Sequence, residues 1–401
     1  MGIWSSIGQD LQTVTDSLRL GRSGIIYDQS RIDYGYQSGL VGNVPKPDLK
    51  LFLSRQERMM MSDDAEYAYM SARQAFEQAG IGKDYFYHHD VGIIWGSEGN
   101  SHQQEYIRRM EEMHCTALVG SNAMIRTAAS SVVMNLATIF YLQGINMSIS
   151  SACASASHAI CTAFMHITQG TEDMILVGGS GSAAKEEVIG MVIDALCKDE
   201  CYNSNPTAGS RPFDEGAVGE IFSGGAAALV VEEYDHAIAR GATILAEIKS
   251  FAMASGHTND IYVTDWKAGQ KAIEKALKKA NLSPNEIDFV RTYASSDKYV
   301  DWFEAKSLSN VFSGLDTAIC ATESITGHEG AMSGASGIIY TILMMKNGFI
   351  APHINLENPI PEAQQLNIPH STQSRAVKTA LITSAGLGSN YIAIIISNVN
   401  D

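Results

Sequence analysis

Two short segments of the sequence combine a reactive side chain with small residues that would give a substrate access to it. In the first, Asn146–Ile160, Cys153 follows an apolar stretch and precedes a run of Ala and Ser. A cysteine at the turn between a strand and a helix lies at the positive end of that helix, which favours its thiolate and presents the sulfur as a nucleophile. A buried structural cysteine is the alternative interpretation.

The second segment, Ala321–Gly337, places His328 on a loop before a helix rich in Gly, Ala and Ser. A histidine in this setting can reach across a narrow site as an acid, a base or an oxyanion donor. Taken alone, a structural histidine explains the residue equally well. Glu329 follows His328, but no second His stands at the helical spacing of a zinc peptidase, so this segment does not predict a zinc site.

Two further patterns are weaker indications of a ligand. Gly179–Ala184 imitates the dinucleotide-binding fingerprint G-x-G-x-x-A, which keeps a dinucleotide-dependent oxidoreductase as a minor hypothesis. The acidic residue that normally follows about twenty positions later is missing. Cys197 and Cys201 have no second pair, so they do not predict a metal site. We therefore expect no cofactor and no metal.

The elements that must position these segments alternate between strands and helices. We expect strands at 91–95, 146–150, 174–177, 226–232, 243–250, 287–293, 317–321, 380–384 and 391–397. We expect helices at 9–21, 63–79, 127–142, 154–169, 235–241, 266–280, from 301 onward, and at 331–345. This order predicts an α/β chain with sheets covered on both faces. Its halves, 1–238 and 239–401, each carry one reactive turn, and no linker separates them.

Composition excludes several classes of function. The 401 residues include 28 basic and 44 acidic side chains, a net charge of −16, which argues against a nucleic-acid binder and a protein held by anionic lipid. The stretch Thr127–Thr171 contains no Asp, Glu, Lys or Arg, but polar residues interrupt it too often for a membrane span, so it predicts dry core. The start shows no signal peptide and the cysteines are scattered, so we expect reduced thiols in the cytoplasm.

Taken in order along the chain, the motifs resemble those of the β-ketoacyl-acyl-carrier-protein synthases of the thiolase fold. The matching segments are Gly2–Gly8, Gly21–Ile25, Ser150–Ser155, Arg211–Asp214, Val230–Gly241, Thr326–His328 and Gly348–Pro352. The resemblance implies a five-layered α-β-α-β-α unit made of two pseudo-repeated βαβαβ halves. It also implies that Cys153 takes an acyl chain from carrier protein as a thioester. Since the family usually has a strand before the Gly2 segment, we expect either that the first strand is missing or that the start codon is misassigned.

The resemblance also reveals departures at the catalytic positions. Cys153 and His328 stand where the family has its nucleophile and its second histidine. Tyr293 replaces the first histidine, and Glu323 replaces the lysine that precedes the second one. The family's mid-chain R-D-G-F becomes Ala217–Glu220. Its oxyanion and gating loop becomes Ala385, Gly386, Leu387 and Gly388.

These departures predict weak condensing chemistry. Tyr293, with a reference pKa near 10, can donate a hydrogen bond but supplies no cation at neutral pH. Glu323 reverses a charge where the family accommodates an enolate. Losing a single preorganised oxyanion donor typically lowers the rate by ~10²–10³. We therefore expect little condensation, whereas the Cys153 thiol stays open to acylation.

The resulting hypothesis is a chain-length-factor-like subunit that pairs with an active ketosynthase subunit and shapes the acyl tunnel of a polyketide, aryl-polyene-like or fatty acid pathway. The alternative is an independently active homodimeric β-ketoacyl-ACP synthase that uses Cys153 with Tyr293 and His328. Acyl carrier protein is the expected partner in both cases, and it brings its own phosphopantetheine. We expect no nucleic acid and no membrane. The resemblance implies that 127–144 and 106–115 lie near the dimer interface and the tunnel.

Overall fold

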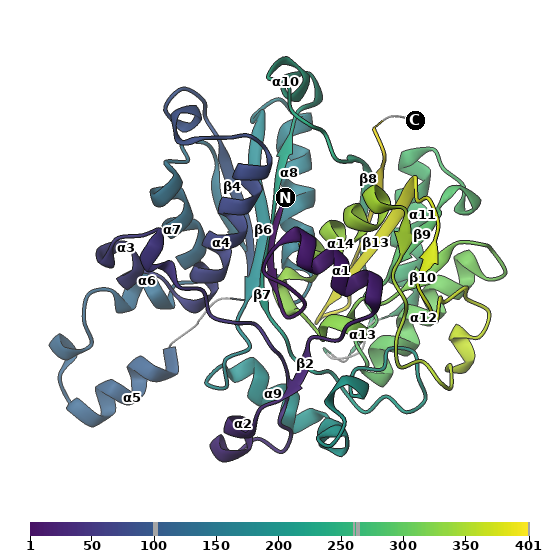
Figure 1. Ribbon diagram of the computed structural model, residues 1–401, viewed down its shortest axis with the longest axis horizontal. Coiled ribbons are helices and arrows are strands. Elements are labelled where there is room, and N and C mark those ends of the chain that lie inside the picture. The colour runs from purple at the N-terminus through teal and green to yellow at the C-terminus, as the bar shows by residue number, and fades with distance from the viewer. Residues whose placement is uncertain (99–102, 260, 262–264, 400–401) are drawn as a thin grey trace.

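Two five-stranded sheets form the centre of the computed structural model, which describes residues 1–98, 103–259, 261 and 265–399 (Figure 1). The first sheet has the order β1-β7-β6-β4-β5 and the second the order β10-β9-β13-β14-β8. The strands of the first sheet are β1 (Gly2–Ser5), β4 (Gly92–Ser97), β5 (Asn146–Ile149), β6 (Met174–Gly181) and β7 (Gly225–Glu232). Those of the second are β8 (Glu247–Ser255), β9 (Phe289–Arg291), β10 (Ala318–Cys320), β13 (Thr379–Gly386) and β14 (Asn390–Ser397).

The two sheets repeat one pattern of strand directions. From β5, successive neighbours are parallel, parallel, antiparallel and antiparallel. From β10 the same series occurs. The halves are therefore internal repeats, in which β5 corresponds to β10 and β4 to β9.

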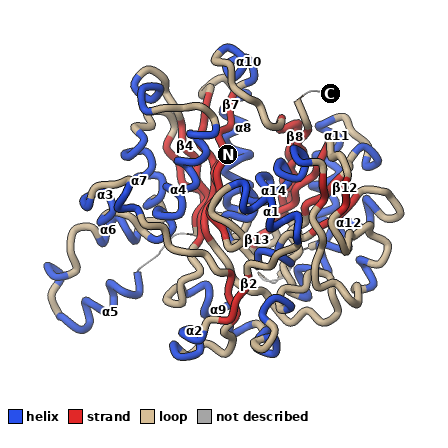
Figure 2. Tube along the Cα trace, viewed as in Figure 1, coloured by secondary structure: helices blue, strands red, loops and turns tan. Residues whose placement is uncertain are grey.

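Helices fill the space between the sheets and cover their outer faces (Figure 2). On the outer face of the first sheet lie α4 (Asp63–Gln78) and α7 (Ser131–Phe140). Between the sheets lie α8 (Ser155–Thr168) and α14 (Ser333–Asn347), and α14 is buried from Ser333 to Met345. On the far face of the second sheet lie α11 (Trp266–Ala280) and α12 (Lys298–Phe312). The predicted five-layered α-β-α-β-α arrangement is confirmed.

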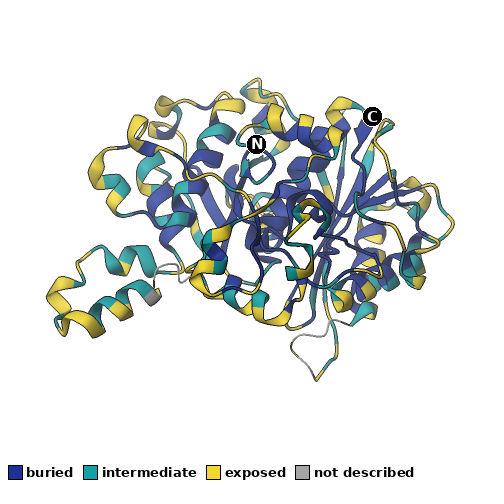
Figure 3. Cartoon of the chain, turned by 60° about the horizontal axis from the view of Figure 1, so that its bottom comes forward, coloured by how far each residue is buried: buried dark blue, intermediate teal, exposed yellow. Residues whose placement is uncertain are grey.

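The remaining elements surround this centre. They are α1 (Leu11–Leu20), α2 (Gln29–Tyr34), α3 (Arg55–Met59), α5 (Gln103–Met113), α6 (Ala123–Thr127), α9 (Val188–Leu196), α10 (Tyr234–Ala239), α13 (Glu323–Thr326), β2 (Ile25–Tyr27), β3 (Leu40–Gly42), β11 (Phe349–Ile350) and β12 (Gln373–Ser374). The α5 helix stands apart from the body of the molecule (Figure 3). In the part of the chain that the structure describes, no helix is both long and apolar enough to cross a bilayer.

Three expectations about the elements were wrong. The first strand is present: β1 pairs antiparallel with β7 through Gly2 to Ser5, and a run of only four residues is too short to stand out in the sequence. The stretch 127–142 is not one helix, because an extended Ala128 ends α6 and α7 begins only at Ser131. The charge-free segment is not dry throughout, since Asn146 and Ser150 are exposed beside the uncovered outer edge of β5.

Candidate active site

The nucleophile turn connects β5 to α8. Ala152 has a left-handed backbone, with φ of 48°, a strained conformation for a residue with a side chain. The turn is fixed by the Ser155 hydroxyl, which accepts from the Ser151 N–H at 2.8 Å and donates to the Ala152 carbonyl at 2.5 Å. Cys153 thus projects from a sharp corner just before the first turn of α8. The structure places it where the sequence predicted.

The histidine turn lies after β10 and α13, in the equivalent position of the second repeat. The His328 N–H donates to the Ile221 carbonyl at 2.8 Å, and its own carbonyl accepts from the Ser223 N–H at 2.8 Å. These bonds hold the imidazole so that Nε2 lies 3.0 Å from Sγ of Cys153. Its Nδ1 is buried and has no hydrogen-bond partner. The repeat therefore brings together a thiol and an imidazole 175 positions apart.

Tyr293 follows β9 and completes the thiol's surroundings. Its hydroxyl hydrogen-bonds with the Cys153 thiol, and its ring meets the His328 ring edge-on with centroids 5.7 Å apart. Its backbone N–H donates to Glu304 Oε1 and to Thr383 Oγ1. Burial, Cys153 and nearby carboxylates raise the pKa of Tyr293 well above 10. This side chain is therefore a neutral hydrogen-bonding group at pH 7.

Two carboxyl side chains that the sequence reasoning did not assign also act on the Cys153 thiol. Glu98 comes directly after β4, and its Oε1 lies 4.0 Å from Sγ. Glu220 lies in the connection between β6 and β7 and accepts from the Ser295 hydroxyl at 2.5 Å. Glu98 could have been found, because side chains at the carboxyl ends of parallel strands line the usual ligand edge of such sheets. Glu220 lay inside a segment noted only for its departure from the family's motif.

The expected thiolate at Cys153 is a further correction. Burial, followed by Glu98 and Glu220, raises the pKa of the Cys153 thiol well above 9, so the sulfur carries its proton at neutral pH. A helix N-terminus contributes only about 0.3–1 kcal/mol toward an anion, less than desolvation and two neighbouring acids oppose. A nucleophilic Cys153 must therefore pass its proton to His328 as it attacks.

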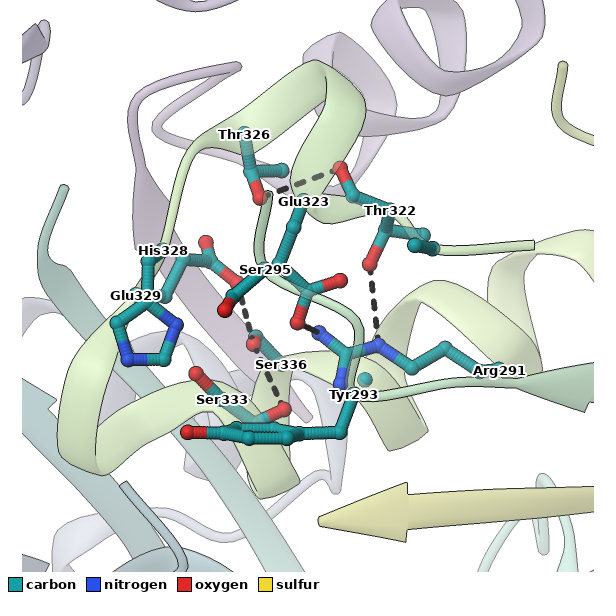
Figure 4. Close-up of polar contacts among 12 residues, drawn as sticks. Arg291, Tyr293, Ser295, Thr322, Glu323, Thr326, His328, Glu329, Ser333 and Ser336 are labelled. Carbon is teal, nitrogen blue, oxygen red and sulfur yellow. Dashed lines mark hydrogen bonds and ion pairs between the residues drawn. The ribbon is translucent and has the colours of Figure 1, made fainter. Parts of the chain in front are cut away.

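Glu323 does not present an unpaired reversed charge, contrary to expectation. Its Oε1 lies 2.7 Å from Nη2 of Arg291, and neither side chain is exposed to solvent (Figure 4). The Nε of Arg291 also donates to Thr322 Oγ1 at 3.0 Å. Gly337 makes room for the guanidinium, because a Cβ there would lie 2.9 Å from Nε. Burial raises the pKa of Glu323, and the neighbouring Arg291 guanidinium opposes that rise.

Ala385 and Gly386 end β13, and Leu387 and Gly388 lie in the turn to β14; this segment packs against the turn that carries Cys153. A Cβ at Gly386 would lie 2.8 Å from the Ser151 carbonyl oxygen, so only glycine permits this approach. Ala385 is buried, whereas half of Leu387 is exposed. The predicted oxyanion and gating loop thus lies beside Cys153.

The two weaker ligand patterns do not form ligand sites. Gly179 and Gly181 belong to β6, and a Cβ on Gly179 would lie 2.6 Å from the Ala331 carbonyl, so this glycine permits close packing next to the histidine turn. A strand interior is not the loop before a helix that a dinucleotide site needs. Among the described residues, no three His, Cys, Asp or Glu side chains gather in a way that could hold a metal ion.

The five layers, the internal repeat and the facing cysteine and histidine turns define a protein of the thiolase-fold class. Within that class, residues 1–237 match the family model for the N-terminal domain of beta-ketoacyl synthases, and residues 245–357 match the model for their C-terminal domain. The chain therefore belongs to the beta-ketoacyl synthase family.

Comparison with individual proteins gives the same family. The chain is 34% identical over 405 residues to 3-oxoacyl-[acyl-carrier-protein] synthase 1 of Escherichia coli (strain K12), covering 100% of this chain and 98% of that protein. It superposes on a beta-ketoacyl synthase from Burkholderia phymatum STM815 with a TM-score of 0.91, 26% identity and coverage of 100% and 98%. The ishigamide ketosynthase/chain length factor gives a TM-score of 0.90 at 22% identity with the same coverage, a likeness of fold.

Proposed function

We propose that this chain is a chain-length-factor-like subunit of a heterodimeric β-ketoacyl-ACP synthase. The observation that carries the proposal is the mixed character of the site: Cys153 keeps its contact with His328, but the neutral Tyr293 hydroxyl occupies the other catalytic position. Stabilising an enolate requires preorganised donors aimed at the developing negative charge. Here the nearby cation, Arg291, is held by Glu323. Condensation by this chain alone should therefore be slow.

Acyl transfer needs less from the site. Sγ of Cys153 attacks the thioester carbonyl, a carbon–sulfur bond forms to Cys153, and the bond to the pantetheine sulfur breaks. The thiol proton moves to Nε2 of His328, 3.0 Å away, and then to the departing thiolate. The proposed subunit can therefore accept an acyl group at Cys153 and shape the tunnel, while its partner carries the growing chain and performs the condensation.

An uncovered surface supports a partner subunit. The outer edge of β5 is unpaired among the described strands, and such an edge usually receives another strand or a cover. The α9 helix presents Val188, Val192 and Leu196 at intervals of four, and they are 48%, 41% and 67% exposed. An apolar stripe of this kind on a helix surface fits burial in an assembly.

A basic pocket supports acyl carrier protein as a partner. It has a volume of about 480 Å³ and is lined by Lys46, Lys50, Arg55 and Arg58, together with two acids and apolar residues. In a chain of net charge −16, this local excess of cations is suited to an acidic protein that carries a phosphate group. Arg55→Glu with Arg58→Glu should weaken carrier binding at low salt, whereas Lys271→Glu, an exposed control on α11, should not.

Condensation assays test the proposal. The purified chain is supplied with acyl- and malonyl-carrier protein, alone and together with a ketosynthase from the same genome that has an intact Cys-His-His site. The proposal expects background turnover alone and full turnover, with a defined product length, in the mixture. Full turnover by the chain alone would refute it.

The second candidate is an independently active homodimeric β-ketoacyl-ACP synthase. The specific observation in its favour is 34% identity to the Escherichia coli enzyme along the whole chain. It requires that Cys153 perform a full cycle with Tyr293 and His328. The Cys153→Ala variant separates the two candidates, since it must abolish turnover by an active enzyme but leave condensation by a separate partner subunit largely intact.

A further inference from the structure

Glu98 is a carboxyl group beside the reactive sulfur that acyl transfer by Cys153 and His328 does not use. Its Oε1 lies 4.0 Å from Sγ of Cys153, and Nε2 of His328 lies 3.0 Å from the same sulfur. The carboxyl group accepts a hydrogen bond from the Ala331 N–H. Gly330 leaves room for it, because a Cβ there would lie 3.2 Å from Oε1. The histidine turn of the second repeat therefore holds a carboxyl group next to the thiol of the first.

The Glu98 carboxyl group has the properties of a general base at neutral pH. Desolvation raises its pKa from 4.5 to about 7, so roughly half of the molecules carry the carboxylate at pH 7. General-base catalysis is most effective when the pKa of the base lies near the working pH. Cys153 and Glu98 both keep some exposure to solvent, so water can reach them. A base, a nucleophile and access for water thus meet at one point of the site.

We propose that the chain also hydrolyses acyl thioesters, with Cys153 as the nucleophile and Glu98 as the general base that activates water against acyl-Cys153. The substrate class is an acyl thioester of pantetheine, and the products are a carboxylic acid and a free thiol. This activity goes beyond the proposed function, because it needs neither a partner subunit nor a malonyl group. It shares with that function only the acylation of Cys153.

The hydrolytic step balances without a further reactant. The oxygen of water bonds to the carbonyl carbon of acyl-Cys153, and one proton of that water moves to the Glu98 carboxylate. The carbon–sulfur bond then breaks, and its electron pair stays on Sγ. Glu98 returns the proton to this sulfur across the 4.0 Å that separate them. The acyl group leaves as a carboxylic acid, and the thiol is restored for another acyl group.

The oxyanion formed during hydrolysis has a suitable donor in Tyr293. The Tyr293 hydroxyl hydrogen-bonds with the Cys153 thiol, so it lies beside the carbonyl of an acyl group on that sulfur. Its pKa is well above 10, so it keeps its proton. Condensation also requires stabilisation of an enolate from a second substrate, whereas hydrolysis requires this donor, the base and water. The tyrosine that weakens condensation is therefore compatible with hydrolysis.

Two other carboxylates near Glu98 provide a comparison. The charges of Glu220 and Glu187 both raise the pKa of Glu98. Glu187 lies directly before α9, and Glu220 accepts a hydrogen bond from the Ser295 hydroxyl at 2.5 Å. Glu220→Gln therefore removes a carboxylate from the same surroundings without removing the proposed base, which makes it the matched control.

Separate measurements of acylation and deacylation test the proposal. The full chain is mixed with hexanoyl-N-acetylcysteamine thioester, with no partner subunit, carrier protein or malonyl group present. Acylation of Cys153 is followed by intact mass, and release of hexanoate is followed by liquid chromatography with mass detection. The proteins compared are wild type, Cys153→Ala, Glu98→Gln, Glu220→Gln, and Glu215→Gln at an exposed position.

We expect wild type to release hexanoate over many turnovers and Cys153→Ala to release none above the uncatalysed rate. Glu98→Gln should slow deacylation by about 10²-fold or more, the usual contribution of a general base, without slowing acylation. Hexanoyl-Cys153 should therefore accumulate in this variant. The deacylation rate of wild type should rise with pH around the pKa of Glu98, about 7, and Glu98→Gln should lack this rise. Glu220→Gln and Glu215→Gln should deacylate at close to the wild-type rate.

Three results would overturn the proposal: no hexanoylation of wild type, hexanoyl-Cys153 that is stable in wild type, or equal deacylation rates in wild type and Glu98→Gln. Thermal unfolding of each variant identifies a loss of fold. If Glu98→Gln unfolds, Glu98→Asp supplies the comparison, because it withdraws the carboxyl group by one methylene and should also slow deacylation. Failure of the proposed function is read separately, as condensation by the chain without a partner.

Discussion

The buried pair of Arg291 and Glu323 makes an asymmetric prediction about stability. Replacing Glu323 with Met leaves a guanidinium with no solvent exposure and no carboxylate, and an arginine cannot shed its charge. Breaking a buried pair in this way costs about 3–5 kcal/mol. Replacing Arg291 with Met leaves Glu323, whose pKa burial raises and Arg291 lowers. Without Arg291 that carboxyl is protonated at pH 7, so the loss should be smaller, about 1–3 kcal/mol.

The double variant supplies the decisive comparison. Two methionines remove both charges and fill a similar volume. Such replacements of buried ion pairs often change the free energy of unfolding by no more than about 1–2 kcal/mol. The loss of unfolding free energy in the double variant should therefore be at least about 2 kcal/mol smaller than the sum of the losses in the two single variants. Asp316→Asn is the control, because the Asp316–Arg375 pair, at 3.1 Å, involves an aspartate that is 90% exposed. Its loss should cost less than about 1 kcal/mol.

Urea unfolding at pH 7, followed by tryptophan fluorescence and far-UV circular dichroism, measures these differences. Coincident transitions and equal m-values are required before midpoints are converted to free energies. Equal losses in Arg291→Met and Glu323→Met would refute the reasoning, since the asymmetry depends on the ability of only one partner to become neutral. A double variant as unstable as the sum of the singles would show that the two charges do not stabilise one another.

Three other predictions concern the surroundings of Cys153. Burial raises the pKa of Glu98 from 4.5 to about 7, so the folded chain keeps a proton that the unfolded chain releases. The stability of wild type relative to Glu98→Gln should therefore fall between about pH 4.5 and 7, by an amount on the order of 3 kcal/mol, as measured by urea unfolding at each pH. Iodoacetamide at pH 7 should alkylate the exposed Cys201 before Cys153, and Glu98→Gln should accelerate the reaction of Cys153, as read by peptide mass spectrometry. Glu304 accepts from four groups, including the Tyr293 N–H and the Tyr391 hydroxyl, so Glu304→Gln should destabilise the chain by about 2–4 kcal/mol in the same unfolding assay; an unchanged midpoint would contradict this.

The sequence predicted well those elements whose own burial determines their pattern of apolar residues. The strands β4 and β6 are buried along their whole lengths, so each produces a short unbroken apolar run that ends at a glycine. The four-residue β1 was missed because its burial depends on β7, which is more than two hundred residues away in the sequence. The break between α6 and α7 was missed because Ala128, the residue that ends α6, is a good helix former.

The site was predictable only in part, for a similar reason. Cys153 and His328 stand on turns with a local signature of small residues, and the internal repeat brings those turns together. The electrostatics have no local signature: Glu98, Glu220 and Arg291 act through residues distant in sequence. The preference of a helix end for a thiolate was outweighed by acids that local patterns do not place near Cys153.

The ion pair also changes what the departures from the family's motif mean. Taken alone, Glu323 suggests a site that has lost a cation and become defective. With Arg291 2.7 Å away and Gly337 leaving room for it, the charge has instead been neutralised inside a well-packed interior. Glu323→Lys alone would therefore place two buried cations together and should unfold the chain rather than restore condensation. Recovery of the family's arrangement would also require Tyr293→His and removal of the Arg291 cation in the same molecule. A site in which several residues must change together is adapted to a different task. A partner subunit that performs the condensation is therefore the simplest explanation of this site.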